Sequence, residues 1–283
     1  MYTLLRRRAG LWTRYFLLFI VGVLIIYPFL WLVGASFKNN HDIFSQVSFL
    51  PLHPQIDGYI NGWAAGGGHT FSTFYINTFF YVIVRVLVTV FSSVITAYGF
   101  ARFTFPTKKP FMAVLIATLL FPATVILVPS YVMFNYIGWV NNYAPLVVPS
   151  LFGTDTFFVF MMIQFMRTIP TEMDKAAMID GCGSFRRLIY ILLPLLKPVI
   201  VTIVLFQFIW TWNDFLGPMI YLSSEGKFPV SVALKLTMDT ASGAVAWQNV
   251  MAMSVLAILP SLIVFIFAQS YFVEGISTTG LKE

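Results

Sequence analysis

Long apolar runs constrain this chain more than any other feature of its sequence. Runs of about 18 residues or more, the length that crosses the hydrocarbon layer as an α-helix, recur along its 283 residues. Only 10% of the residues are charged, and 59% are hydrophobic. This hydrophobic share exceeds what a soluble protein of this size would contain. Because backbone polar groups in lipid must be satisfied internally, the runs predict an all-α integral membrane protein built as a helical bundle.

Six of these runs are predicted to span the bilayer. They cover residues 15–37, 71–101, 111–136, 150–166, 194–215 and 250–272. Pro122 and Pro129 fall inside the third run and are expected to kink it, because proline lacks the backbone donor that a helix needs. The first run could instead be a secretory signal, with residues 34–36 as a cleavage site. Its length and the runs that follow favour an uncleaved first transmembrane helix.

The distribution of basic residues predicts the orientation. Six spans place both termini and the polar segment around Gly181 on the same side of the membrane. That side collects Arg6, Arg7, Arg8, Arg14, Arg102, Lys108, Lys109, Arg167, Lys175, Arg186, Arg187, Lys197 and Lys282. The other side holds Lys38, Lys227 and Lys235. Because basic residues concentrate in cytoplasmic loops, we expect a multi-pass protein of the plasma or inner membrane with both termini in the cytoplasm.

The charged stretch from Pro170 to Pro198 is the most distinctive polar segment. Thr171 and Asp174 have the spacing of a capping box, so a helix should begin there. Gly181 should end that helix in the left-handed conformation, and Gly183-Ser184 offers a bend and a new N-cap. Met173, Ala176 and Ala177 are expected to share one face of the helix, where the alanines would allow another backbone to approach closely.

A second helix is predicted after this bend. Its apolar residues recur at helical spacing and are Phe185, Leu188, Ile189 and Leu192. Arg186 and Arg187 lie elsewhere on the helix and either face lipid headgroups or contact a partner.

This segment resembles the EAA loop of membrane subunits of binding-protein-dependent ABC importers. That pattern is Glu-Ala-Ala, three residues, Gly, nine residues, then Ile-x-Leu-Pro. The matching residues are Ala176, Ala177, Asp180, Gly181, Ile191, Leu193 and Pro194, whereas Lys175 stands at the glutamate position. The resemblance implies that this helix docks in a cleft of an ATPase subunit. The implied coupling residues are Glu172, Asp174, Lys175, Ala176, Ala177, Asp180, Gly181 and Ser184.

The resemblance extends to the maltose-permease-like branch of carbohydrate importers. Its further motifs are the run Trp212-Asn213-Asp214 and a tail from Tyr271 to Lys282. It implies a type I ABC importer transmembrane fold. Residues 1–70 then hold the N-terminal cytoplasmic segment, the first helix and an external loop. The core domain is 71–272, with the coupling loop at 168–194, and the cytoplasmic tail is 273–283.

The sequence lacks the motif that an ATPase would need. G-x-x-x-x-G-K-[ST] does not occur, since Gly226-Lys227 is followed by Phe228. We therefore expect no catalytic activity and no cofactor in this chain, with ATP and Mg²⁺ bound by partner subunits. The three histidines lack metal-ligand spacing, and a single cysteine excludes an internal disulfide.

Two places are candidates for the substrate path. Arg85 lies deep in a span, where a charge is costly unless it faces water, a partner or the bundle interior. It either pairs with carbonyls or a partner subunit, or lines the path. Trp210, Asn213 and Asp214 lie near the outer end of the fifth span. Aromatic and polar groups suit sugar rings, and an interfacial aromatic belt is the alternative.

These features predict the permease subunit of an ABC importer that moves sugars, with oligosaccharides favoured, into the cytoplasm. The resemblance implies as partners a second, homologous permease, for which this branch favours a different chain, two ATPase subunits and an external sugar-binding protein. The polar loop at residues 223–248 is expected to meet the binding protein, and lipid but no nucleic acid is expected as a further partner. A non-sugar solute such as glycerol phosphate is the alternative. An ion-coupled transporter is disfavoured because we place no Asp or Glu deep in a span.

Overall fold

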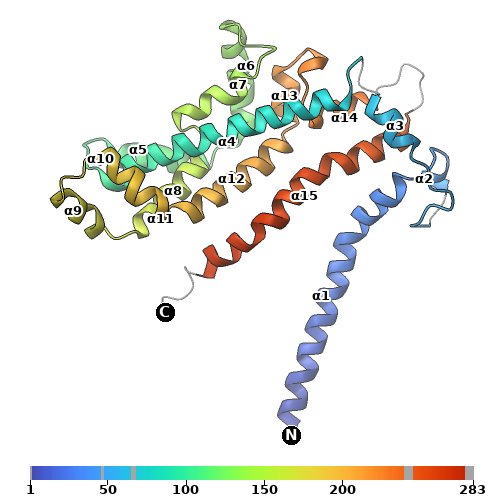
Figure 1. The fold of residues 1–283 in the computed structure, drawn as a ribbon, viewed down its shortest axis with the longest axis horizontal. Coiled ribbons are helices and arrows are strands. Elements are labelled where there is room, and N and C mark those ends of the chain that lie inside the picture. The colour runs from blue at the N-terminus through green and yellow to red at the C-terminus, as the bar shows by residue number, and fades with distance from the viewer. Residues whose placement is uncertain (1, 46–47, 65–67, 239–244, 278–283) are drawn as a thin grey trace. The chain divides into compact units, whose positions relative to one another are not determined.

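The computed structural model describes residues 2–45, 48–64, 68–238 and 245–277, and every regular element within them is helical (Figure 1). The three longest helices are α1 (Tyr2–Ala35), α4 (Phe71–Arg102) and α15 (Trp247–Ser277). Helices of intermediate length are α5 (Lys108–Leu119), α6 (Ala123–Tyr136), α8 (Thr156–Thr168) and α12 (Lys197–Trp212). The short elements are α2 (Asp42–Ser45), α3 (Asp57–Ala64), α7 (Ala144–Val147), η1 (Val148–Phe152), α9 (Glu172–Ile179), α10 (Ser184–Arg186), η2 (Arg187–Leu192), α11 (Leu193–Leu195), α13 (Leu216–Tyr221), η3 (Glu225–Lys227) and α14 (Val230–Leu236).

Within the described residues, four helical segments are long and apolar enough to cross a membrane by themselves. They are Arg14–Ala35, Phe71–Arg102, Ala144–Thr168 and Trp247–Gln269. Two bent helix pairs, Lys108–Leu119 with Thr124–Tyr136 and Ser184–Leu195 with Lys197–Trp212, raise the number to six if each pair is one span. The predicted all-α membrane architecture is therefore confirmed.

The third predicted span differs from the kinked helix that the sequence suggested. Helices α5 and α6 are bent by 106° relative to each other, which is far more than a proline kink. Pro122 precedes α6 in an extended conformation, with φ −62° and ψ 127°, so the helical hydrogen bonds stop there. Pro129 lies inside α6, where the helix continues through it.

The connection between the third and fourth spans is shorter than the gap between residues 136 and 150 that the apolar runs predict. The segment 138–149, which the sequence leaves between the third and fourth apolar runs, contains the helix α7 and the first two residues of the 3₁₀ turn η1. Gly153 ends η1 with φ 71°, a left-handed value that glycine adopts without strain. The fourth span therefore begins with short helical turns at Ala144 and continues into α8.

Packing divides the chain into two compact units, which are described separately. One unit comprises residues 1–71 and 233–258, and the other comprises residues 72–232 and 259–283. The predicted limits of the domains stay a prediction, and the predicted tail motif at Gly280 to Lys282 lies outside the described residues.

In the first unit, the short helix α3 packs closely against the start of α15. Gly58 and Gly62, one helical turn apart, lie at this contact. A Cβ at Gly58 would lie 2.6 Å from the backbone oxygen of Gln248, and one at Gly62 would lie 3.0 Å from Met253. Such glycine pairs let two helix backbones approach. Asn40 adds a second tie, because its Nδ2 donates to the carbonyl of Val245 at 3.0 Å.

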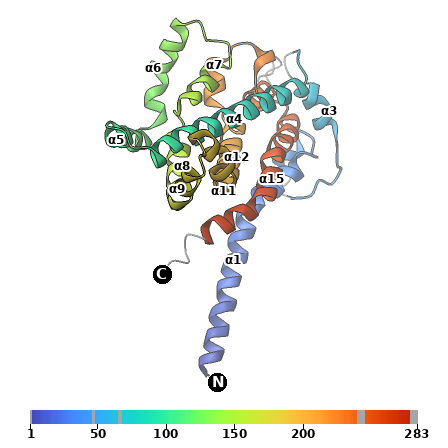
Figure 2. The same cartoon turned by 60° about the vertical axis from the view of Figure 1, so that its left-hand side comes forward.

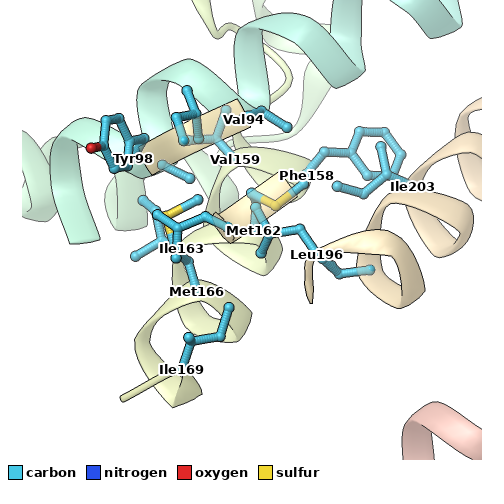
Figure 3. Packing of buried hydrophobic residues seen from close by; sticks show 14 of the residues in the cluster. Val94, Tyr98, Phe158, Val159, Met162, Ile163, Met166, Ile169, Leu196 and Ile203 are labelled. Atoms are coloured by element: carbon cyan, nitrogen blue, oxygen red, sulfur yellow. The ribbon is translucent and has the colours of Figure 1, made fainter. Parts of the chain in front are cut away.

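In the second unit, α8 provides the centre of the apolar core (Figure 3). Its buried residues follow a helical stripe and are Phe158, Val159, Met162, Ile163 and Met166. Val94 and Tyr98 of α4 pack against this stripe, and so do Leu196 and Ile203 around the start of α12. Lipid tails are as apolar as these side chains, so close packing holds the helices together rather than the exclusion of water.

Candidate functional site

The helix α9 begins at Glu172, as predicted, but without the predicted capping box. Thr171 has a helical conformation, with φ −72° and ψ −15°, and makes no side-chain cap hydrogen bond. Asp174 is buried, and its Oδ2 lies 2.8 Å from Nε of Arg102. The carboxylate therefore pairs with a distant arginine instead of the start of its own helix.

The end of α9 agrees with the prediction. Gly181 has φ 75°, the left-handed value expected of a closing glycine. Its N–H donates to the carbonyl of Met178 at 3.1 Å, and the N–H of Cys182 donates to the carbonyl of Ala177 at 2.9 Å. These two bonds form a Schellman motif, which satisfies the last carbonyls of the helix.

The two faces of α9 carry different residues. Asp174 and Ala177 are buried, so the predicted face shared by Met173, Ala176 and Ala177 is wrong for Ala177. The exposed candidates for coupling are Glu172, Lys175, Ala176, Asp180, Gly181 and Ser184. Two apolar side chains missed by the sequence analysis are also exposed, Met178 at 59% and Ile179 at 87%. The outward face therefore combines charge with unburied apolar surface.

The helix after α9 also departs from its expected pattern. Gly183 occupies its N-cap in an extended conformation, and Ser184 is its first residue. Residues Arg187–Leu192 form a π-helix, in which Leu188 and Leu192 are buried. Phe185, which was expected on the same stripe, is 72% exposed. A π-helix turns more slowly than an α-helix, so the predicted stripe splits between two faces.

The ribbon views place α9 and α10 next to the end of α4 (Figure 1 and Figure 2), and three side-chain contacts join the loop to that end. Nη2 of Arg102 donates to the carbonyl of Ile169 at 2.9 Å. Arg102 also forms the ion pair with Asp174, although its Nε–H is not aligned for a hydrogen bond. The hydroxyl of Tyr98 donates to the carbonyl of Ser184 at 2.9 Å. The loop is thus attached to α4 before, within and after α9.

Arg85 is engaged by partners from within its own unit. Its Nη2 lies 2.7 Å from Oδ1 of Asp155, and its Nη1 donates to the carbonyl of Leu146. Thr89 donates to the second oxygen of Asp155 at 2.6 Å. Of the two interpretations left open by the sequence, this geometry matches pairing with carbonyls, with a carboxylate added. Asp155, inside the candidate span Ala144–Thr168, also corrects the expectation that no Asp or Glu lies deep in a span.

Arg85 belongs to a polar row on α4 that the sequence analysis overlooked. Asn77, Tyr81, Arg85 and Thr89 recur every four residues, which places them on one helix face. Nδ2 of Asn77 donates to the carbonyls of residues 226 and 228, at 2.9 and 3.1 Å. The hydroxyl of Tyr81 donates to Asp214 at 3.0 Å. Polar residues spaced by four in an apolar helix were the available signal.

Trp210, Asn213 and Asp214 have separate surroundings. Trp210 is 50% exposed, and its ring lies 5.0 and 5.4 Å from those of Phe158 and Phe157. Nδ2 of Asn213 donates to the carbonyl of Ile209 at 2.8 Å, so this side chain caps the end of α12. Of these three residues, Trp210 therefore offers a half-exposed aromatic ring, whereas the side-chain amide of Asn213 is used within the helix.

Asp214 is held inside a hydrogen-bonded turn. Its carboxylate accepts from Tyr81 and from the N–H of Gly217 at 3.1 Å, and its carbonyl accepts from Ser231 at 2.7 Å. Its polar atoms are used to hold the loop after α12.

Asn141 organises the adjoining loop. It has φ 60°, a left-handed conformation that asparagine tolerates better than most residues. Its side chain donates to the hydroxyl of Ser224 at 2.8 Å, and its carbonyl accepts from Lys227 at 2.8 Å. Tyr143 donates to the carbonyl of Lys227 at 2.6 Å. Residues 223–228 therefore form a fixed surface rather than a loose loop.

No metal centre is found in the part of the chain that the structure describes. There, no three His, Cys, Asp or Glu side chains gather closely enough to hold one ion. The expectation that this chain binds no cofactor stays a prediction.

Sequence comparisons identify relatives along nearly the whole chain. The family described as "Binding-protein-dependent transport system inner membrane component" matches residues 89–278. "Probable ABC transporter permease protein YurM" of Bacillus subtilis is 30% identical over 94% of this chain and 86% of that protein. "Galactooligosaccharides transport system permease protein GanQ" of the same organism is 28% identical over 98% of this chain and 97% of that protein. "sn-glycerol-3-phosphate transport system permease protein UgpE" of Brucella melitensis is 28% identical over 93% of this chain and 95% of that protein.

A solved structure shows the same fold. It is the crystal structure of a bacterial ABC transporter involved in the import of the acidic polysaccharide alginate. One of its chains matches with a TM-score of 0.80 and 24% identity, covering 94% of this chain and 97% of that chain. The predicted ABC importer transmembrane fold is therefore confirmed.

Replacing Asp155 by Asn tests the Arg85 pair. The side chains of Arg85 and Asp155 are 20% and 14% exposed, and breaking a buried pair costs about 3–5 kcal/mol, so we expect a loss near 3 kcal/mol. The measurement is the unfolding free energy in detergent, with the exposed Asp57→Asn as a matched control. Equal stability of the two variants would contradict a structural role for the pair.

Proposed function

This chain belongs to the family of binding-protein-dependent transport system inner membrane components, and from that membership we propose that its substrates are sugars, with oligosaccharides favoured. It is the permease component of an ABC importer and is not itself an enzyme. The relative GanQ bears the name of a galactooligosaccharide system. The relative UgpE bears the name of an sn-glycerol-3-phosphate transport system, and this solute is the second candidate substrate.

One observation favours a sugar over a phosphate ester. Arg85, the basic residue deepest in a span, is already neutralised by Asp155 at 2.7 Å and bound by a carbonyl. A phosphate would compete with that carboxylate for the guanidinium. The half-exposed ring of Trp210, beside Phe157, instead offers the kind of apolar surface that packs against the C–H face of a sugar.

The coupling of transport to ATP rests on α9. Its outward face carries Lys175, Ala176, Met178 and Ile179, and its end is closed rigidly at Gly181. Exposed apolar side chains on a polar helix are typical of a contact with another protein. We infer that this face docks on one of two ATPase subunits, which bind ATP and Mg²⁺.

The remaining partners follow from the same reasoning. We infer a second, different permease as partner and an external sugar-binding protein that contacts residues 223–248, of which 239–244 lie outside the described residues. The fixed surface at 223–228, held by Asn77, Asn141 and Tyr143, supports that contact. The basic residues near both termini and α9 support a cytoplasmic location for these parts.

Uptake by cells that lack this chain tests the substrate class. We expect uptake of labelled galactooligosaccharide or another oligosaccharide to fall while uptake of labelled sn-glycerol 3-phosphate is unchanged. Loss of glycerol phosphate uptake alone would overturn the sugar assignment.

Trp210→Ala should weaken oligosaccharide uptake by about tenfold, as loss of about 1.4 kcal/mol of stacking implies, and Trp210→Phe should retain most of that uptake.

An aspartate at Ile179 tests the docking face. Burying an isoleucine side chain is worth about 1.5–3 kcal/mol, so Ile179→Asp should reduce the ATPase that co-purifies with the chain by about tenfold or more. Ile56→Asp is the control, because Ile56 is exposed at 60% in the segment predicted to be external. Full retention of the ATPase by Ile179→Asp would exclude α9 as the docking face.

Cysteine labelling tests the orientation in intact cells. In a chain with Cys182→Ser, a cysteine at Ser184 should resist a membrane-impermeant thiol reagent, whereas one at the exposed Ser223 should react. The reverse pattern would place α9 outside the cell and refute the proposed topology.

A further inference from the structure

Five residues form an attachment between α4 and the coupling loop, here termed the α4 clamp. They are Tyr98, Arg102, Ile169, Asp174 and Ser184. The side chains of Arg102 and Asp174 are only 7% and 9% exposed. Because removing one partner leaves an uncompensated buried charge, this ion pair resists opening. The clamp uses the buried face of α9, whereas the proposed docking on an ATPase uses the exposed face with Met178 and Ile179.

The clamp decides how α9 is oriented. A helix of eight residues is marginal by itself, and the chain on both sides of α9 is non-helical. Ile169 is held before it and Ser184 after it, so α9 cannot rotate without disturbing α4. Ala177, which is only 7% exposed, lies on the buried side of α9 together with Asp174.

Helix α4 is suited to carry a displacement away from the clamp. It is continuous for 32 residues without proline, a length of about 48 Å at 1.5 Å per residue (Figure 1). Toward its other end, Asn77 bonds the carbonyls of residues 226 and 228, and Thr78 accepts from the N–H of Val230 at 2.8 Å. One rigid element thus touches the coupling loop and the loop at residues 226–230.

We propose that Arg102 and Asp174 are positioning residues that make α9 and α4 move as one body. A displacement of α9 then reaches residues 226–230 through α4, without passing through the apolar core. The inference rests on the proposed function, because it assumes that an ATPase displaces α9. It adds the route by which that displacement crosses the membrane.

The first test follows the far end of α4 in the purified complex. The chain carries Cys182→Ser and a nitroxide on Glu225→Cys, an exposed site next to the Asn77 contact. Trapping the ATPase with ATP and vanadate should shift the label's collision rate with a water-soluble nickel complex, because the loop at residues 226–230 moves with α4. Arg102→Gln and Asp174→Asn should abolish that change while trapping remains normal.

Matched variants separate positioning from general damage. Lys109→Gln removes an exposed charge at the same end of the bundle and should keep the full change. Arg102→Lys keeps the charge and should recover part of the change in collision rate. Because the two residues act as a unit, the double variant should be no worse than either single one. A full change in both single variants, with normal trapping, would overturn the proposal.

The second test needs no ATPase. Amide hydrogen exchange of residues 172–182 in the isolated chain should be faster in Arg102→Gln and Asp174→Asn than in Lys109→Gln. Equal exchange rates would also overturn the clamp. If the unmodified complex fails to trap nucleotide, the proposed function fails, and this exchange measurement still decides whether the clamp exists.

Discussion

A charge inside the hydrocarbon layer must find its partner within the protein, and much of the second unit is arranged around that constraint. Arg85 meets it through Asp155, a carbonyl and, indirectly, Thr89. The pair fixes the start of α8 against the middle of α4. Because α8 supplies the centre of the apolar core, the register between these two helices determines how the rest of the core packs.

Helix α4 satisfies polar groups of other segments along its whole length. Asn77 and Tyr81 hold loops near one end, Arg85 and Thr89 hold the middle, and Arg102 holds the coupling loop at the other. The acceptors are carbonyls and carboxylates from several other segments, and Arg85 and Thr89 share the carboxylate of Asp155. A span that packed through apolar contacts alone would leave these segments free to shift, because lipid competes equally for apolar surface.

Local features of the sequence predicted local features of the structure well. The left-handed end at Gly181 follows from a glycine placed after a short helical pattern, and the long spans follow from apolar runs. The errors arose where a distant residue outcompetes a neighbour. Asp174 pairs with Arg102 across 72 positions in the chain instead of capping its own helix, and Asp155 was overlooked although it matches Arg85. The polar row on α4, spaced by four residues, could have been recognised from the sequence; its partners could not.

The close approach of α3 to α15 has a consequence for how such chains can be recombined. With Gly58 and Gly62 pressed against the backbone of Gln248 and the side chain of Met253, the segment between the first two spans is shaped to one particular surface. A chimera that imports residues 38–70 from a relative would carry a foreign side chain into that contact unless residues 245–253 came from the same donor. The two segments are therefore a single module, although about 180 positions of chain separate them.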